Sequence, residues 1–412
     1  MSFPKPIRII SKKALFAAWR ASRDSTRRAG RPGINNVTAE QFAAKLDANL
    51  SEVVRRLRRG DYGFSKLRAV LIPKPNSDKE RLICIPVIQD RLVQRVICDY
   101  VSSRKIFPIY NSSSYGFIKG RGTREAINAV VRLRGKYDWC LKTDIESFFD
   151  RIPRGYLKQQ IERYLGKHSL APLLCSVIDC EVKLTSANRQ RIAKQNIVAG
   201  KGVRQGMPLS PLLANLALAE FDQKIDRRRL EMVRYADDLV LFFPTKDAAR
   251  AGEEFVKSLL GEIQLTIPEI YDGSKTKIVS RSEPLEFLGR EIVYLGSENK
   301  FVARVSSRQI EKIKSRLTDD FSFAARLEEQ KNFQETIVDL SKSLAAYLGI
   351  YGDAHNYSFF ADELRGHGRV VVRKIFEDLF GHASLQALGQ NERKFLGIDM
   401  AYVIEPNSEL DV

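Results

Sequence analysis

The sequence predicts an α+β protein with antiparallel strand pairs in its middle and helices towards both ends. Strand pairs are expected where short β-branched and apolar runs flank a brief polar turn, as in residues 232–243, MVRYADDLVLFF. Helices are expected where apolar residues recur every three or four positions, as they do from about residue 305 onward. With 412 residues, 44% of them apolar and 29% charged, the chain is long enough for two or three domains.

The charge balance points to a polyanionic partner. Lys and Arg outnumber Asp and Glu by 68 to 50, which gives a formal net charge of +18. No apolar run approaches a membrane span, and the first residues lack the apolar core of a secretory signal, so we expect nucleic acid and no membrane. The five cysteines form no CxxC pair and the four histidines are scattered, which predicts neither zinc nor disulfides and fits a reducing cytoplasm.

The first sixty residues are basic and mostly helical in pattern, with a break at residues 30–33. Thr38 is expected to cap a helix, because Gln41 follows three residues later and apolar residues then recur at helical spacing. This helix should end at Gly60.

Residues 67–87 form two β-rich runs joined by a polar loop, which predicts a hairpin. Lys74, Lys79 and Arg81 lie in or beside the loop, so the hairpin could place several cations over one point. A solvated basic loop is an equally good interpretation.

A glycine-rich basic loop at residues 114–122 follows a helical stretch at residues 90–101. Its glycines could let the backbone approach phosphates beside Lys119 and Arg121, although this pattern is a weak signal by itself. A further helix is expected from about Thr123.

Acidic residues follow predicted strands at two places. A strand from about Trp139 should end at Asp144, where a carboxylate would be held rigidly at the edge of a sheet. Asp237 and Asp238 lie in the turn of residues 232–243, and neighbouring carboxylates raise each other's pKa unless a cation lies between them. The pattern indicates a metal site; taken alone, the Asp-Asp pair fits a solvated turn better.

A glycine-bearing loop in residues 202–222 runs into a strongly apolar helix and carries Gln205 and Ser210 at its mouth. Ser210 could instead simply cap that helix. Later, a helix is expected at residues 248–260, and residues 273–280 should bring two lysines into a strand.

The first helix after residue 305 has an apolar face and a basic face. The basic residues recur at i, i+4 and i+8, so they could follow a phosphate backbone, and a plain solvated face is equally compatible. The acidic tail after Glu405 is expected to be disordered. The basic face consists of Arg308, Lys312 and Arg316.

Taken together, these blocks resemble the reverse transcriptase family, and most closely its bacterial enzymes of the group II intron type. The motifs occur in the order IPKP, DRLVQ, SYGF, DIxxFFD, QGMPLSP, YADD, KTKI and FLG, and the resemblance covers roughly residues 29–295. The resemblance implies a right-hand polymerase with fingers, a palm of antiparallel sheet and packed helices, and a helical thumb. The implied parts are an N-terminal extension (1–60), fingers (61–135), palm (136–300, with a returning fingers segment at 151–200), and thumb with tail (301–412).

Matching each motif to this chain implies roles for single residues. Asp144 and Asp237 match the metal-binding catalytic aspartates, with Asp238 beside them and the backbone of Ile145 also at the metal. Phe149 matches the residue under the sugar of the incoming nucleotide. The remaining matches are Lys74, Arg81, Gln205 and Lys275 for the dNTP, and Phe287, Leu288 and Gly289 for the grip on the primer end. Nucleic-acid contacts are expected from Lys119, Arg121, Arg308, Lys312 and Arg316.

Some features depart from the family pattern. The finger loop is one residue longer and has Arg81-Leu82 without an intervening proline, while GINN near Asn35 and FIKGRG near Phe117 replace the usual GVDG and FRPGRS types. No endonuclease-like segment follows the thumb, and the NAxxH and VTG blocks of retron enzymes are missing. These departures favour a stand-alone bacterial enzyme of the defence-associated or abortive-infection type.

The resemblance implies an RNA-directed DNA polymerase that extends a primer with dNTPs by using two Mg²⁺ ions, for which Mn²⁺ can substitute. A structured non-coding RNA is the expected template, DNA the product, and anti-phage defence in the cytoplasm the expected role. Two alternatives stay open: a template-independent or RNA-synthesising polymerase on the same palm, and a catalytically silent nucleic-acid-binding scaffold. The sequence indicates no particular protein partner.

Overall fold

The computed structural model describes residues 8–28, 32–73, 80–166, 168–195, 197–198, 200–389 and 391–392. Lys74, Lys79 and the tail after Glu405 lie outside these ranges. The chain forms two compact units, one of Met1–Ala126 and Tyr137–Ile278 and the other of Ile127–Lys136 and Val279–Val412. Helices combine with antiparallel strands, so the predicted α+β class is confirmed. The four-part division into extension, fingers, palm and thumb stays a prediction.

Unit 1 begins with helices that pack against one another and against the helix after the first hairpin. Thr38 and Gln41 form the predicted capping box, and Gly60 ends the third helix with a φ of 78°. The hairpin of β1 and β2 is antiparallel, as predicted. These elements are α1 (Lys12–Arg28), α2 (Ala39–Ala44), α3 (Leu46–Arg59), β1 (Arg68–Pro73), β2 (Glu80–Ile85) and α4 (Ile88–Ser103).

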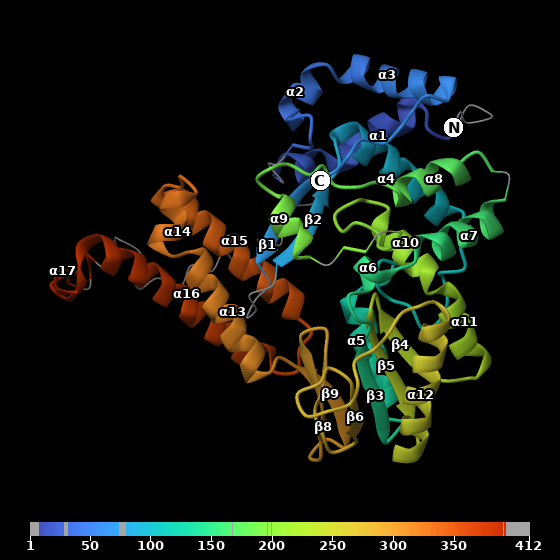
Figure 1. Cartoon of the computed structure of the whole chain (residues 1–412). Coiled ribbons are helices and arrows are strands. Elements are labelled where there is room, and N and C mark those ends of the chain that lie inside the picture. The colour runs from blue at the N-terminus through green and yellow to red at the C-terminus, as the bar shows by residue number, and fades with distance from the viewer. Residues whose placement is uncertain are drawn as a thin grey trace. The chain divides into compact units, whose positions relative to one another are not determined.

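The central sheet has the strand order β4-β5-β3-β6, and β5 pairs antiparallel with both β3 and β4. Helix α12 (Lys246–Glu262) packs along β3 and β5, as Figure 1 shows. The predicted strand ending at Asp144 and the predicted pair around the Asp-Asp turn are therefore confirmed. The strands are β3 (Trp139–Asp144), β4 (Met232–Tyr235), β5 (Asp238–Phe243) and β6 (Lys277–Ser280).

The other helices of the middle of the chain surround a largely apolar core that runs from the N-terminal helices to the central sheet. The expected helix from Thr123 is present and crosses from unit 1 into unit 2. The helices are α5 (Thr123–Arg134), α6 (Phe148–Arg151), α7 (Arg154–Leu165), α8 (Ala171–Ile178), α9 (Arg189–Ala193), α10 (Ser210–Ala217) and α11 (Ala219–Arg227).

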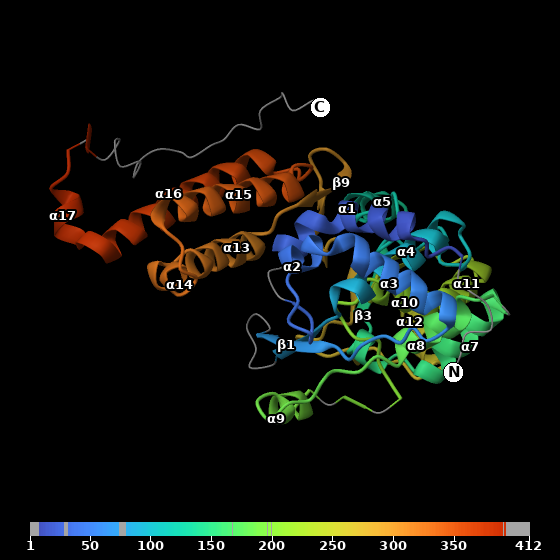
Figure 2. The same cartoon turned by 90° about the horizontal axis from the view of Figure 1, so that it is seen from above.

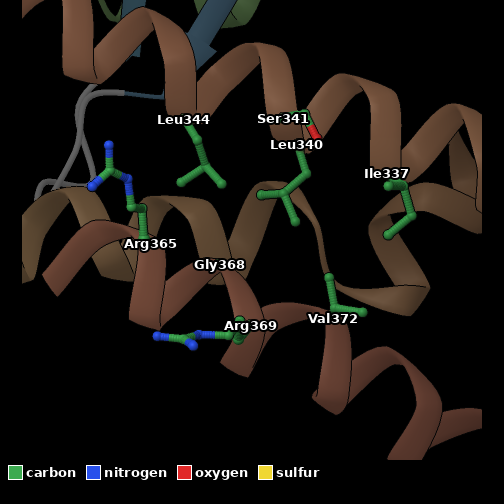
Figure 3. A pocket seen from close by; sticks show the side chains of 8 residues that line it. All are labelled: Ile337, Leu340, Ser341, Leu344, Arg365, Gly368, Arg369 and Val372. Carbon is green, nitrogen blue, oxygen red and sulfur yellow. The ribbon is translucent and has the colours of Figure 1, made fainter. Parts of the chain in front are cut away.

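Unit 2 combines a three-stranded antiparallel sheet with helices, and α16 packs against both α13 and α15 (Figure 2). Leucines of α15 point towards α16, where a Cβ on Gly368 would lie 2.8 Å from Leu344 Cδ1 (Figure 3). None of the described helices is long and apolar enough to cross a membrane. The elements are β7 (Leu285–Phe287), β8 (Arg290–Leu295), β9 (Lys300–Arg304), α13 (Ser307–Asp320), α14 (Phe323–Glu328), α15 (Phe333–Tyr351), α16 (Tyr357–Phe380) and α17 (His382–Gln386).

A buried ion pair holds the turn between β4 and β5. Arg234 and Asp222 are both 0% exposed, and Arg234 Nε donates to Asp222 Oδ1 at 2.8 Å. Arg234 Nη1 also donates to Asn215 Oδ1 at 2.9 Å and to the carbonyl of Ala236 at 3.1 Å. Because Ala236 has a φ of 57°, the guanidinium supports a left-handed residue just before the two aspartates.

The SYGF segment runs beside this turn. The Tyr115 N–H donates to the Arg234 carbonyl at 2.8 Å, and Asn215 Nδ2 donates to the Gly116 carbonyl at 2.8 Å. A Cβ on Gly116 would lie 2.5 Å from the backbone nitrogen of Ala236, which is closer than real Cβ contacts come. Only glycine therefore fits where these two backbones meet.

We predict that Gly116→Ala lowers the free energy of unfolding by about 1–3 kcal/mol, as overpacking does, because neither backbone can yield without disturbing the other. Chemical denaturation monitored by circular dichroism measures the change. Gly63→Ala is the matched control, since a Cβ there meets nothing within 4 Å. Equal stability of the two variants would contradict the assigned contact.

Candidate active site

Three carboxylates meet at one edge of the central sheet. Asp144 is the last residue of β3 and lies directly opposite Asp238, the first residue of β5. Asp237 lies in the turn between β4 and β5, and its carbonyl accepts a 3.0 Å hydrogen bond from the N–H of Ile145. The register of one antiparallel pair thus brings together residues that are far apart in the sequence.

Two lysines partly neutralise these acids. Lys142 pairs with Asp238, and Lys275 pairs with Asp144. Burial raises the pKa of Asp237 and of Asp238, and the Asp144 charge raises the pKa of Asp237 further. Three carboxylates therefore face two ammonium groups, and the site retains an attraction for a further cation.

The donor set suits a hard divalent ion, which takes oxygen ligands. Asp144 Oδ1 is buried and has no hydrogen-bond partner among the described atoms, so one carboxylate oxygen is available. Among the described residues, no three acidic, histidine or cysteine side chains converge closely enough to hold a metal. Asp144, Asp237, Asp238 and the backbone of Ile145 stay predicted ligands.

A cavity of about 800 Å³ in unit 1 collects three of the residues expected to bind the incoming nucleotide. Arg81 reaches it from β2, Phe149 from α6, and Gln205 from the loop before α10. Lys275 is placed at Asp144 instead, and Lys74 lies outside the described residues. The volume lies within the range typical of small-molecule sites.

The two neighbouring phenylalanines of α6 have different environments. Phe148 is 2% exposed and belongs to the core, whereas Phe149 is half-buried and lines the cavity. The backbone carbonyl of Phe149 accepts a 2.7 Å hydrogen bond from Val203, which ties α6 to the Gln205 loop. Of the two rings, only that of Phe149 is therefore available to a bound sugar.

The Gln205 loop is hydrogen-bonded to the β1–β2 hairpin. The Cys84 N–H donates to the Gln205 carbonyl at 2.7 Å, and a Cβ on Gly206, whose φ is 102°, would lie 2.6 Å from the Cys84 carbonyl oxygen. Ser210 does not cap α10, because its hydroxyl donates to the Arg204 carbonyl at 2.7 Å instead. The capping alternative is thus wrong, and Ser210 lines the cavity.

Sequence reasoning missed two arginines of α4. Arg91 and Arg95 also line the cavity, and burial lowers the pKa of both guanidinium groups. Arg91 Nε is buried without a hydrogen-bond partner among the described atoms. Their i, i+4 spacing was a usable signal, since it places both on one face of the helix.

The two basic residues of the SYGF loop differ in role. Arg121 Nη1 donates to the carbonyls of Asn111 at 2.5 Å and Ser114 at 2.7 Å, so this guanidinium organises the loop itself. Lys119 is exposed and can reach a ligand outside the protein.

The predicted primer-grip residues belong to unit 2. Phe287 is 1% exposed, and Leu288 and Gly289 form a left-handed turn with φ values of 49° and 75°. A Cβ on Gly289 would lie 2.9 Å from the Tyr351 hydroxyl, so the turn packs directly on the end of α15. Its contact with a primer stays a prediction.

Helix α13 has the two faces that its sequence predicts. The apolar side is buried in the core of unit 2, and the basic side is exposed, with Arg316 also pairing with Asp320 at 3.4 Å. Nucleic-acid binding by this face stays a prediction. The exposed residues are Arg308, Lys312 and Arg316.

Comparisons with known proteins agree with this geometry. Protein YkfC of Escherichia coli (strain K12) is 28% identical over 336 residues, which cover 70% of this chain and 82% of YkfC. The group II intron-encoded protein LtrA of Lactococcus lactis subsp. cremoris is 26% identical over 219 residues, 52% of this chain and 34% of LtrA. The retron Ec73 reverse transcriptase of Escherichia coli is 25% identical over 190 residues, 44% of this chain and 55% of that enzyme.

The chain thus spans most of YkfC but only about a third of LtrA and about half of the retron enzyme. Residues 72–292, more than half of the chain, match the model of the family described as reverse transcriptase (RNA-dependent DNA polymerase). This matched range contains the acidic sheet edge and the cavity-lining residues Arg81, Phe149 and Gln205. The predicted resemblance is confirmed: the chain belongs to the reverse transcriptase family of RNA-dependent DNA polymerases.

Proposed function

We propose that this protein extends a primer with dNTPs along an RNA template by two-metal phosphoryl transfer. The observation that carries the proposal is the register of β3 and β5, which places Asp144 opposite Asp238 with Asp237 in the adjoining turn. Phe149, only five residues beyond Asp144, lines a cavity together with Arg81 and Gln205. Acidic ligands and nucleotide contacts therefore come from adjacent parts of one unit.

Divalent ions at such carboxylates would activate the primer hydroxyl and neutralise the leaving pyrophosphate. Asp144 and Asp237 would hold them, and Mg²⁺, with Mn²⁺ as substitute, fits their oxygen donors. Lys142 keeps Asp238 in place, since its side chain is only 17% exposed. Lys275, whose side chain is 72% exposed, can leave Asp144 and meet the phosphates of the nucleotide, while Arg81 and Gln205 orient that nucleotide in the cavity.

The test is incorporation of labelled dNTP or NTP by the purified protein, with and without an RNA template and with and without Mg²⁺. Template- and metal-dependent incorporation of dNTP is the expected result. Incorporation without template, or a preference for NTP, would support the RNA-synthesising or template-independent alternative. A protein that binds nucleic acid and incorporates nothing would be a scaffold.

The template, the product and the biological setting are inferred from the sequence motifs alone. We infer a dedicated structured RNA as template, DNA as product, and anti-phage defence in the cytoplasm as the setting. Sequencing the RNA and DNA that co-purify with the protein tests the template, since one dominant structured RNA is expected and a random transcript mixture would oppose it.

Asp237→Asn should abolish incorporation, because an amide does not replace a carboxylate as a ligand of Mg²⁺. The variant should also unfold at a higher temperature than wild type at neutral pH without divalent ions, since burial opposes the charge of Asp237. Added Mg²⁺ should stabilise wild type and have less effect on the variant. Undiminished incorporation by the folded variant would contradict the assignment.

The same stability difference should depend on pH. The folded-state pKa of Asp237 is raised, so the folded protein holds this proton more tightly than the unfolded chain. The wild-type carboxyl is therefore tolerated below the ordinary carboxyl pKa of about 4 and becomes destabilising as the pH rises through the folded-state pKa. Thermal unfolding should show the gain from Asp237→Asn at pH 7 and its loss at about pH 3.5; a gain independent of pH would argue against this cause.

Phe149→Ala should admit ribonucleotides about tens of times better relative to dNTPs, because the Phe149 ring faces the cavity where a ribose 2′-hydroxyl would collide with it. Single-nucleotide incorporation of dNTP and NTP gives the ratio. Phe148→Ala is the control, since Phe148 is buried in the core and should mainly lose stability. A larger change of the ratio in the Phe148 variant would show that the gate is misassigned.

Replacing Arg308, Lys312 and Arg316 together by Ala should reduce the salt dependence of nucleic-acid binding. The slope of log K against log salt changes by about 0.7–0.9 per phosphate contact, so a shallowing of about two to three is expected. Fluorescence anisotropy over a salt series measures it. A slope equal to that of wild type would show that this face is a solvated surface that does not contact nucleic acid.

A further inference from the structure

A strongly basic segment follows α8 and lies outside the sites described above. Residues 182–201, here called the basic excursion, contain five basic residues, and no acidic residue occurs from residue 182 until Glu220. The whole chain contains 50 acidic residues, so a stretch of this length without one is a marked local bias. The basic residues are Lys183, Arg189, Arg191, Lys194 and Lys201.

Both ends of the basic excursion are hydrogen-bonded to elements that flank the nucleotide cavity. At its start, the Lys183 N–H donates to the Leu67 carbonyl at 2.8 Å, one residue before β1. Directly after its end, the Gly202 N–H donates at 2.8 Å to the carbonyl of Ile152, the residue that follows α6. The partner strand of β1 carries Arg81, and α6 carries Phe149.

The middle of the basic excursion is exposed. Helix α9 stands apart from the other helices of unit 1 in Figure 2. Lys183, Arg189 and Lys194 are exposed, and none of them forms an ion pair with a described carboxylate. Arg191 differs, because it pairs with Glu80 at the start of β2 and so fastens the excursion to the β1–β2 hairpin.

This composition favours phosphates over bases as the ligand. The basic excursion contains no aromatic residue on which a base could stack, while its three free cations can each reach a phosphate. In a templated reaction, the strand that extends past the incoming nucleotide is template not yet copied. A basic surface anchored on both sides of the nucleotide cavity is therefore placed to meet that strand.

We propose that the basic excursion binds the phosphate backbone of the uncopied RNA template ahead of the active site, without sequence preference. The proposal rests on the proposed function, which supplies the template. It predicts that affinity grows with the length of the template overhang, and that this gain depends on Lys183, Arg189 and Lys194. Arg191 holds the excursion in place through Glu80.

The experiment compares the full chain with a Lys183→Gln, Arg189→Gln, Lys194→Gln triple variant, leaving Arg191 unchanged. Two primer–template duplexes are used, with template overhangs of about one and about twelve nucleotides, without dNTP or divalent ions. For the long overhang, the variant should bind roughly ten- to a hundredfold more weakly at about 0.1 M salt, with a salt slope shallower by about two. Binding of the short overhang and dNTP incorporation on it should not change.

The matched control removes three charges elsewhere in unit 1, by Arg227→Gln, Lys246→Gln and Arg250→Gln on α11 and α12. An equal loss in this control, or an equal loss for both overhangs, would overturn the proposal, because the effect would then come from net charge. Unchanged binding of the long overhang by the triple variant would overturn it as well.

Binding and chemistry are measured separately, so the two proposals fail in different ways. Overhang-dependent binding lost in the triple variant, in a protein that incorporates no nucleotide, would support the surface and refute the polymerase. Normal incorporation without overhang-dependent binding would support the polymerase and refute the template-binding surface. Replacing the RNA overhang by a poly-anionic peptide of equal charge should give no length-dependent binding, and equal binding would refute an RNA surface.

Discussion

The geometry of the acidic sheet edge depends on one buried ion pair. Arg234 and Asp222 exclude water completely, and the same guanidinium reaches Asn215 and the Ala236 carbonyl. Through these contacts β4, the SYGF segment and the helices α10 and α11 share one polar centre beneath the two aspartates. Removing either partner would leave a charge buried and unpaired, which typically costs about 3–5 kcal/mol. Such a centre also restricts the alternatives, since a shifted register of β4 would carry Arg234 away from its only matching carboxylate among the residues described around it.

The two lysines at the acidic edge differ in how exposed their side chains are. Lys142 emerges from β3 itself and is largely enclosed, so it acts as a fixed counter-charge for Asp238. Lys275 lies just before β6 and is mostly exposed, so it can exchange partners at little cost. Hydrogen bonding to Asp144 raises the pKa of Lys275, which favours the charged ammonium in this ion pair. The two ion pairs thus differ, since that of Asp238 is enclosed and that of Asp144 involves a largely exposed lysine.

Most of the features that the sequence predicted correctly depend on residues close together in the chain. The cap at Thr38, the strand end at Asp144 and the hairpin around Asp237 depend on neighbouring residues, and all three are confirmed. Contacts between distant segments could not be predicted in the same way. Nothing in the sequence near Arg234 shows that it is buried against Asp222. Periodicity alone could not show which of Phe148 and Phe149 faces the cavity, because the short helix α6 follows a left-handed Ser147 that sets its rotation. The choice for Ser210 between the loop mouth and a helix cap was open for a similar reason, since its acceptor is the carbonyl of Arg204 in a folded loop.

The division of the chain has a consequence for its synthesis on the ribosome. Unit 2 takes residues 127–136 from the middle of α5, and Arg134, 0% exposed, donates to the Ser280 carbonyl 146 residues later. At about 5–20 residues per second, the end of α5 waits roughly ten to thirty seconds for that partner to be made. Until then the contact between Arg134 and the Ser280 carbonyl cannot form, so the end of α5 completes its packing only after residue 280 has been made. Translation speed across residues 137–280 then becomes a determinant of folding yield.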